Sequence, residues 1–89
     1  LEAFQEVETA LSREVFINRE ITALEAASTA AAVAEQKTQR LYKEGLSNLT
    51  NLLVAQRRAL DIRRNLIQTR RARIENRLSL YLALGGGFQ

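Results

Sequence analysis

The residue types that carry most enzyme chemistry are either missing from this sequence or too far apart to act together. There is no cysteine and no histidine, which removes thiol nucleophiles, histidine bases and the usual ligands of soft metals. The carboxylates of Asp61 and Glu75 are separated by about 21 Å of helix rise, too far for paired acid–base work. Serine and threonine have no histidine to activate them. We therefore predict no enzyme, no cofactor and no metal site.

Consecutive glycines at Gly85 to Gly87 are the one stretch that invites comparison with a phosphate-binding loop. Such a loop lies between a strand and a helix and carries a lysine, and neither feature is present here. We expect these glycines to end a helix and to open a flexible tail over residues 85–89.

Arginines form a pattern of their own, because they recur every seven residues in two rows. The rows are Arg57, Arg64 and Arg71, and Arg63, Arg70 and Arg77. One interpretation is a solvated flank whose stems cover a helix seam while the guanidinium groups pair with glutamates. A nucleic-acid surface and a surface for a membrane or a protein are the alternatives. No aromatic stacking set or zinc-finger spacing accompanies the arginines, so we predict no nucleic-acid partner.

Helices must position these residues, since the chain has no proline and its four glycines fall only at Gly45 and near the end. The first half has apolar or small residues mostly three or four apart, which predicts a helical stripe. They are Phe4, Val7, Leu11, Val15, Ile21, Leu24, Ala27, Ala31, Ala34, Thr38 and Leu41.

Residues 25–35 are rich in alanine, and two interpretations are open. The segment is either an ordinary surface with high helix propensity or a small-residue face that lets another helix approach closely. The second is favoured because the alanines cover one face. Those alanines are Ala26, Ala27, Ala30, Ala31 and Ala34.

The second half shows a seven-residue repeat, which predicts a coiled-coil helix with a left-handed supercoil. The expected seam is Leu53, Leu60, Ile67, Ile74 and Tyr81. A second row lies beside it, consisting of Leu52, Ala59, Leu66 and Leu80 and interrupted only by Arg73.

Between the two helical halves lies the segment RLYKEGLSNL, residues 40–49. Gly45 can adopt the left-handed conformation that ends a helix, and Ser47 or Asn48 can cap the next one. The predicted fold is therefore all-α, a long antiparallel two-helix coiled-coil hairpin. Its expected parts are helix one over about 2–44, a tip turn at 45–47 and helix two over 48–84. A hairpin of this kind has little core of its own and should pack against further helices.

Charge differs between the two halves. Residues 1–45 carry eight acids and five bases, whereas residues 46–89 carry eight arginines against Asp61 and Glu75. Opposite signs favour pairing of the halves with each other.

No apolar run approaches the ~20 residues of a membrane-spanning helix, so we expect that the chain does not itself span the membrane. The chain also lacks an initial methionine, and we therefore expect a piece of a longer protein.

Three landmarks together resemble a known family. They are AFQEVETAL at residues 3–11, LYKEGLSNLTNLLVAQRRALD at residues 41–61 and LYLALGGGF at residues 80–88. In this order and spacing they are similar to the C-terminal periplasmic helical hairpin of TolC-like outer-membrane efflux proteins, in the NodT-type lipoprotein branch. The resemblance covers essentially the whole chain.

What this resemblance implies is a homotrimeric channel of a Gram-negative bacterium, with a β-barrel in the outer membrane and a periplasmic tunnel of helical coiled coils. The hairpin would form tunnel wall, and its tip would dock a periplasmic adaptor protein that connects the tunnel to an inner-membrane pump exporting drugs or other toxic compounds. The tip residues would be Tyr42, Lys43, Glu44, Gly45, Leu46, Ser47 and Asn48.

Some members of the family close the tunnel with a tyrosine and a nearby basic residue at this tip. Tyr42 matches the tyrosine, but Ser47 occupies the basic position. The resemblance therefore implies a gate here that rests on hydrogen bonds or packing rather than on an ion pair. A function from another class remains open, namely a standalone coiled-coil oligomerisation module with no role in transport.

Overall fold

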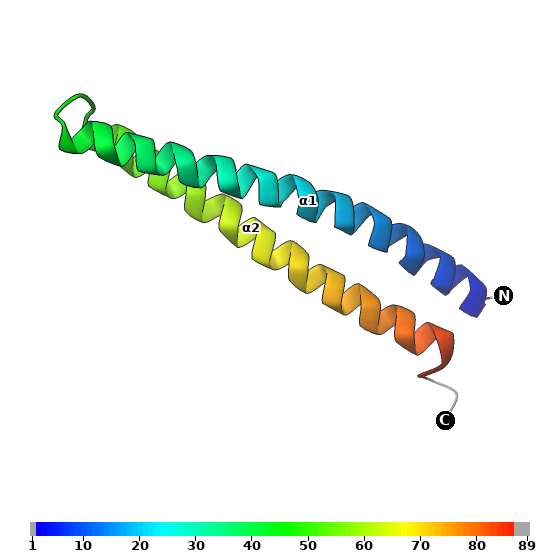
Figure 1. Ribbon diagram of the computed structural model, residues 1–89. Helices are drawn as coiled ribbons and strands as arrows, with labels where there is room; N and C mark the ends of the chain where they lie inside the picture. Colours follow the sequence, from blue (N-terminus) through cyan, green and yellow to red (C-terminus); the bar gives the residue numbers. More distant parts are fainter. Residues whose placement is uncertain (1, 87–89) are drawn as a thin grey trace. The chain divides into compact units, whose positions relative to one another are not determined.

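The computed structural model describes residues 2–86, and the regular elements in that range are all helical. Helix α1 spans Glu2–Lys43, α2 spans Leu49–Tyr81, and a short π-helical segment, η1, spans Leu82–Gly86 with a kink at Gly85, whose backbone is not helical (φ 172°, ψ −9°). The chain reverses between α1 and α2, so the all-α antiparallel two-helix hairpin is confirmed (Figure 1). The α-helical geometry of the second arm ends at Tyr81 and gives way to η1. Residues 87–89 of the expected glycine tail lie outside the described residues.

Helix α1 runs without a break because it contains neither proline nor glycine and is rich in alanine, glutamate and other strong helix formers. Its threonines also bond within the helix. The hydroxyls of Thr22, Thr29 and Thr38 donate to the carbonyls four residues earlier, at 3.0, 3.1 and 2.8 Å. These bonds occupy hydroxyls that would otherwise compete for the backbone in non-helical conformations.

The end of α1 is a glycine C-cap. Gly45 has φ 76°, in the left-handed region, as predicted. The Gly45 amide donates to the Tyr42 carbonyl at 3.0 Å, and the Leu46 amide donates to the Leu41 carbonyl at 2.8 Å. This pair of bonds is the Schellman pattern, which satisfies carbonyls that a helix end leaves without a partner.

The start of α2 is capped by Asn48. Its side-chain Oδ1 accepts a hydrogen bond from the Asn51 amide at 2.8 Å, which satisfies one of the free N–H groups of the first turn. Ser47 plays a different part, since its Oγ accepts from the Asn51 side-chain amide at 3.1 Å. Of the two capping residues considered from the sequence, Asn48 is the cap.

Contacts divide the hairpin into two compact units. The tip unit comprises residues 23–67, and the terminal unit comprises the described residues before and after it, 2–22 and 68–86. In the tip unit, the buried side chains are Ala31 from α1 and Leu52, Ala59 and Leu66 from α2. In the terminal unit, the buried side chains are Ala10, Ile17 and Ile21 from α1 and Asn76 from α2. Each unit therefore has a narrow core between two helices.

The predicted seam needs a correction. The row Leu53, Leu60, Ile67, Ile74 and Tyr81 is 54–67% exposed, so it does not form the seam between α1 and α2. The seam runs one residue earlier along α2. In the tip unit it uses Leu52, Ala59 and Leu66 together with the half-buried Ala55 and Ile62.

The reason lies in the second position of each heptad. A coiled-coil seam needs two apolar or small positions per seven residues, spaced alternately three and four apart. Ala55 and Ile62 provide the second position beside Leu52 and Ala59. The residues that follow Leu60 at the same distances are Arg63 and Arg64, whose charges cannot be buried there without a partner.

Candidate functional site

The tip presents an apolar and aromatic surface on a backbone whose ends are both capped. Leu46 is 72% exposed and Tyr42 is 40% exposed. The two Schellman bonds and the Asn48 cap fix the turn that carries them. A rigid turn that displays large apolar side chains suits recognition, because little conformational entropy is lost when a partner binds.

The seven predicted tip residues all lie in or beside this turn. Ser47 is half-buried, whereas the other six are exposed. The hydroxyl of Ser47 already accepts a hydrogen bond from Asn51, and Tyr42 contributes its backbone carbonyl to the helix cap. The phenol of Tyr42 is thus left on the surface of the hairpin.

A groove follows the helices next to the turn, within the tip unit. It has a volume of about 370 Å³. Its lining is formed mostly of small and polar side chains, namely Ala31, Ala34, Thr38, Leu41, Ser47, Asn51, Val54, Ala55 and Arg58. Because the alanines leave space beside the seam, the groove opens directly behind the tip residues.

Alanines of residues 25–35 take different positions. Ala31 is 6% exposed and Ala27 is half-buried, whereas Ala26, Ala30 and Ala34 are exposed. Ala59 of α2 is also buried, at 4% exposed. Small side chains therefore occupy the seam at Ala31 and Ala59, where they permit close approach of a helix, and the remaining alanines act as helix formers or line the groove.

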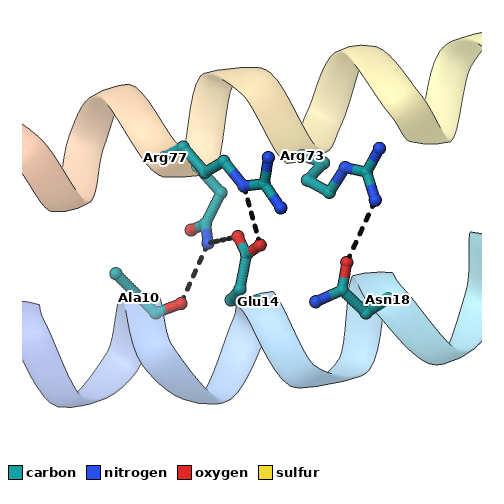
Figure 2. A network of polar contacts seen from close by, with 6 residues as sticks. Ala10, Glu14, Asn18, Arg73 and Arg77 are labelled. Carbon is teal, nitrogen blue, oxygen red and sulfur yellow. Dashed lines mark hydrogen bonds and ion pairs between the residues drawn. The ribbon is translucent and has the colours of Figure 1, made fainter.

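The terminal unit holds a cluster of polar contacts between α1 and α2 (Figure 2). The side-chain amide of Asn76 donates to the Ala10 carbonyl at 2.9 Å and to Glu14 Oε1 at 3.3 Å. Arg77 Nε donates to Glu14 Oε2 at 2.9 Å. Each of these bonds joins residues more than 60 positions apart, so together they fix how the two helices are aligned in this unit.

A further bond extends the cluster along α1, since Arg73 donates to Asn18 Oδ1 at 3.3 Å (Figure 2). The cluster also affects the titration of the Glu14 carboxyl group. The hydrogen bond from Arg77 holds the pKa of Glu14 below its ordinary value, and Asn76 adds to this effect while partial burial opposes it.

Asn76 is 3% exposed, and its Oδ1 has no hydrogen-bond partner within the described residues. A buried amide with one unsatisfied oxygen costs free energy that an apolar residue would not. Such residues are kept in some coiled coils because they fix the alignment of the helices. Asn76 was not singled out from the sequence. The signal that could have found it is its position: Arg73 continues the row of Leu52, Ala59 and Leu66, and Asn76, three residues later, is a polar residue at the second seam position of that heptad.

The comparisons with known proteins identify the family of the hairpin. The model of the outer membrane efflux protein family matches residues 1–86. The chain belongs to this family. It is 34% identical over 87 residues to the cation efflux system protein CusC of Escherichia coli O6:H1 (strain CFT073), which covers 98% of the chain and 19% of that relative. It is 34% identical over 85 residues to the protein of the same name from strain K12, covering 96% of the chain and 19% of the relative.

The hairpin of this outer membrane efflux protein therefore spans about a fifth of the length of the curated relatives that it matches. No solved structure matches the chain. The predicted resemblance to TolC-like efflux proteins is confirmed, and so is the prediction that the chain is not an enzyme.

Two further properties concern the described part of this efflux-family chain. Neither helix there is long and apolar enough to cross a membrane. Across residues 2–86, no three acidic, cysteine or histidine side chains form a group able to hold a metal ion.

Proposed function

We propose that this hairpin is a periplasmic segment of an outer-membrane efflux channel, where it forms part of the tunnel wall and docks a periplasmic adaptor through its tip. The observation that carries the proposal is the tip itself, a turn capped on both sides that exposes Tyr42 and Leu46. The family match over residues 1–86 supports the assignment of this turn to an efflux protein.

The wall role is supported by the surface of α2. Large apolar side chains remain exposed along it at seven-residue spacing, and a two-helix hairpin has no further helix to cover them. By resemblance to its family, the full-length protein is a homotrimeric lipoprotein of the Gram-negative outer membrane. Helices from elsewhere in that assembly would then cover this face.

A passive gate at the tip is part of the same proposal. Tyr42 has an exposed ring, and the position that carries a base in some members of the family is Ser47, whose hydroxyl is bonded to Asn51. Closure of the tunnel would therefore depend on packing and neutral hydrogen bonds of Tyr42. Opening would be a change in packing that adaptor and pump drive by binding the two states with different affinity.

The cargo is proposed as toxic compounds that an inner-membrane pump delivers. Both relatives described above carry the name of a cation efflux system, which favours metal cations over drugs. The test is growth of a bacterial strain lacking its own cation efflux channel and supplied with the full-length protein. Restored tolerance to metal cations without restored tolerance to drugs is the expected result, and the reverse would reject a cation cargo.

Adaptor docking is tested by measuring binding of the chain to its purified cognate periplasmic adaptor. The variant replaces three tip residues by alanine, Tyr42→Ala, Leu46→Ala and Ser47→Ala. We expect affinity to fall by about tenfold or more, because the aromatic and leucine anchors of an interface carry most of its binding energy.

A matched control removes the same kinds of side chain far from the tip. Phe16, Leu11 and Ser12 are an aromatic, a leucine and a serine, all exposed on α1 in the terminal unit. Their replacement by alanine should leave adaptor binding unchanged. Equal losses in both triple variants, or no binding by the unaltered chain, would reject docking through the tip.

A further inference from the structure

Within the tip unit, α2 carries an exposed apolar row enclosed by arginines. This arginine-flanked stripe is defined by Leu53, Leu60 and Ile67 together with Arg57, Arg63 and Arg64. Residues three and four apart are neighbours on a helix surface, so Leu60 lies among all three arginines. The stripe is a second face of α2, separate from the seam row of Leu52 and Ala59.

The stripe is unused inside the hairpin. Leu53, Leu60 and Ile67 are 54%, 55% and 56% exposed, and the arginines around them are also exposed. Within residues 2–86, Arg57, Arg63 and Arg64 form no ion pair. Both the apolar row and its charges are therefore available to a partner.

The spacing specifies the kind of partner. Single exposed leucines are common on protein surfaces and need no explanation. An apolar residue at every seventh position is different, because it presents a continuous row only to another helix that runs along it. The buried row of Leu52, Ala59 and Leu66 has the same period and contacts a helix inside this hairpin.

The arginines of the stripe restrict which helices can be its partner. In coiled coils, residues that flank the apolar row select the partner by pairing with opposite charges. A partner rich in arginine or lysine would be repelled, and this applies to α2 of a second copy, since residues 46–89 carry eight arginines and only two acids. Flanking glutamates or aspartates would pair with these arginines, which form no ion pair in the part of the chain that the structure describes.

We infer that the arginine-flanked stripe binds an amphipathic helix whose apolar residues lie against Leu53, Leu60 and Ile67. The flanking glutamate or aspartate side chains of that helix supply the partner that Arg63, at the second heptad position, needs before this face can be buried. The inference rests on the proposed role of the hairpin in a helical wall, and it adds the chemistry of the helix that lies against this face. The tip is not involved, so the two proposals can fail separately.

The test measures binding of the whole chain to a synthetic helix of about four heptads with leucine in the apolar row and glutamate at the flanking positions. A second peptide has lysine in place of every glutamate. We expect the acidic peptide to bind at least about tenfold more tightly than the basic one, with an affinity that falls as salt is added.

Two charge-reversed variants locate the site. The triple variant Arg57→Glu, Arg63→Glu and Arg64→Glu should lose the acidic peptide and gain the basic one. The control reverses three exposed cations of α1, as Arg19→Glu, Lys37→Glu and Arg40→Glu, and changes the net charge by the same amount. It should bind as the unaltered chain does. Equal effects of the two triples, or equal binding of both peptides, would overturn the inference.

Other occupants give distinct results. Binding of anionic phospholipid vesicles that is lost in the Arg57, Arg63 and Arg64 variant, without binding of the acidic peptide, would mean a membrane surface and overturn the inference. Self-association of the chain that the same variant abolishes, without binding of the acidic peptide, would mean a contact specific to a second copy and also overturn it. Adaptor binding through the tip is measured separately, so its loss or retention does not affect this outcome.

Discussion

The tip unit and the terminal unit hold α1 and α2 together by different means. The tip unit buries alanine and leucine, with Ala31 and Ala59 permitting close approach. The terminal unit also buries apolar side chains, but it adds the buried Asn76 and connects its helices through Glu14 and Arg77. An apolar seam contributes free energy in proportion to its buried area, whereas a polar residue within the seam specifies the alignment of the helices. Directional polar bonds contribute less net free energy and specify the alignment.

The largest expected effect comes from the apolar seam of the tip unit. Leu66→Ala should lower the free energy of unfolding by about 2–4 kcal/mol, because it truncates a residue that is only 6% exposed and leaves a cavity. Leu60→Ala, at an exposed position, should change it by less than about 0.5 kcal/mol. Urea titration followed by helical circular dichroism measures both. Equal losses would place the seam on the Leu60 row after all.

Next in size is the polar cluster of the terminal unit. Asn76→Ala should cost about 1–2 kcal/mol, since it removes the bonds to Ala10 and Glu14 and leaves a small void. The loss should be local. Hydrogen exchange should speed up for amides of residues 5–22 and 70–84 and stay unchanged for residues 30–60. Faster exchange throughout the chain would contradict the difference between the units.

The turn of the tip unit should respond by about 1 kcal/mol. Gly45→Val forces a β-branched side chain into the left-handed region, where it is strained although there is open space around the site. Gly45→Asn is the matched control, because asparagine tolerates this conformation and should cost only a few tenths of a kcal/mol. Thermal unfolding of the two variants compares them. Identical melting temperatures would argue against a strained reversal.

The smallest effect is a dependence on pH confined to the terminal unit. Glu14 has a pKa below its ordinary value of 4.5 because Arg77 donates a hydrogen bond to its carboxylate. Since the folded pKa is lower than the unfolded one, the stabilisation is complete above pH 4.5 and is lost as the pH falls through the folded pKa. Unfolding in urea at neutral and acidic pH should show this loss, and Glu14→Gln should lack it. An unchanged pH dependence in Glu14→Gln would rule out this origin.

The hairpin and its reversal could be predicted because the signals are local and strong. Proline is absent, and the one glycine outside residues 85–87, Gly45, is followed by the capping residue Asn48. The seam was misplaced by one residue because α2 has two neighbouring apolar rows. Leu60 is larger and more apolar than Ala59, yet Ala59 is buried. What decides between the rows is the second heptad position, where Ile62 suits a core and Arg63 does not.

The polar cluster was missed for a related reason. A coiled-coil seam is recognised in a sequence by apolar residues at seam positions, so a polar residue such as Asn76 is taken for an interruption of the heptad pattern. Its partners Ala10 and Glu14 are more than 60 residues away in the chain, and only the three-dimensional alignment of the helices brings them together. Prediction of the tip as a docking site came from family resemblance, and the exposed Tyr42 and Leu46 give it a physical basis.

The reversal at the end of the hairpin is closed entirely by its own neighbours, from the Arg40 carbonyl, which accepts from Glu44, to the Leu52 amide, which donates to Asn48. No group beyond residues 40–52 is required to complete those bonds. This segment is therefore a transferable module. An engineer could graft this turn onto another two-helix scaffold. Exchange of the side chains at positions 42 and 46 would then change which protein the turn recognises, with no change to the two helices.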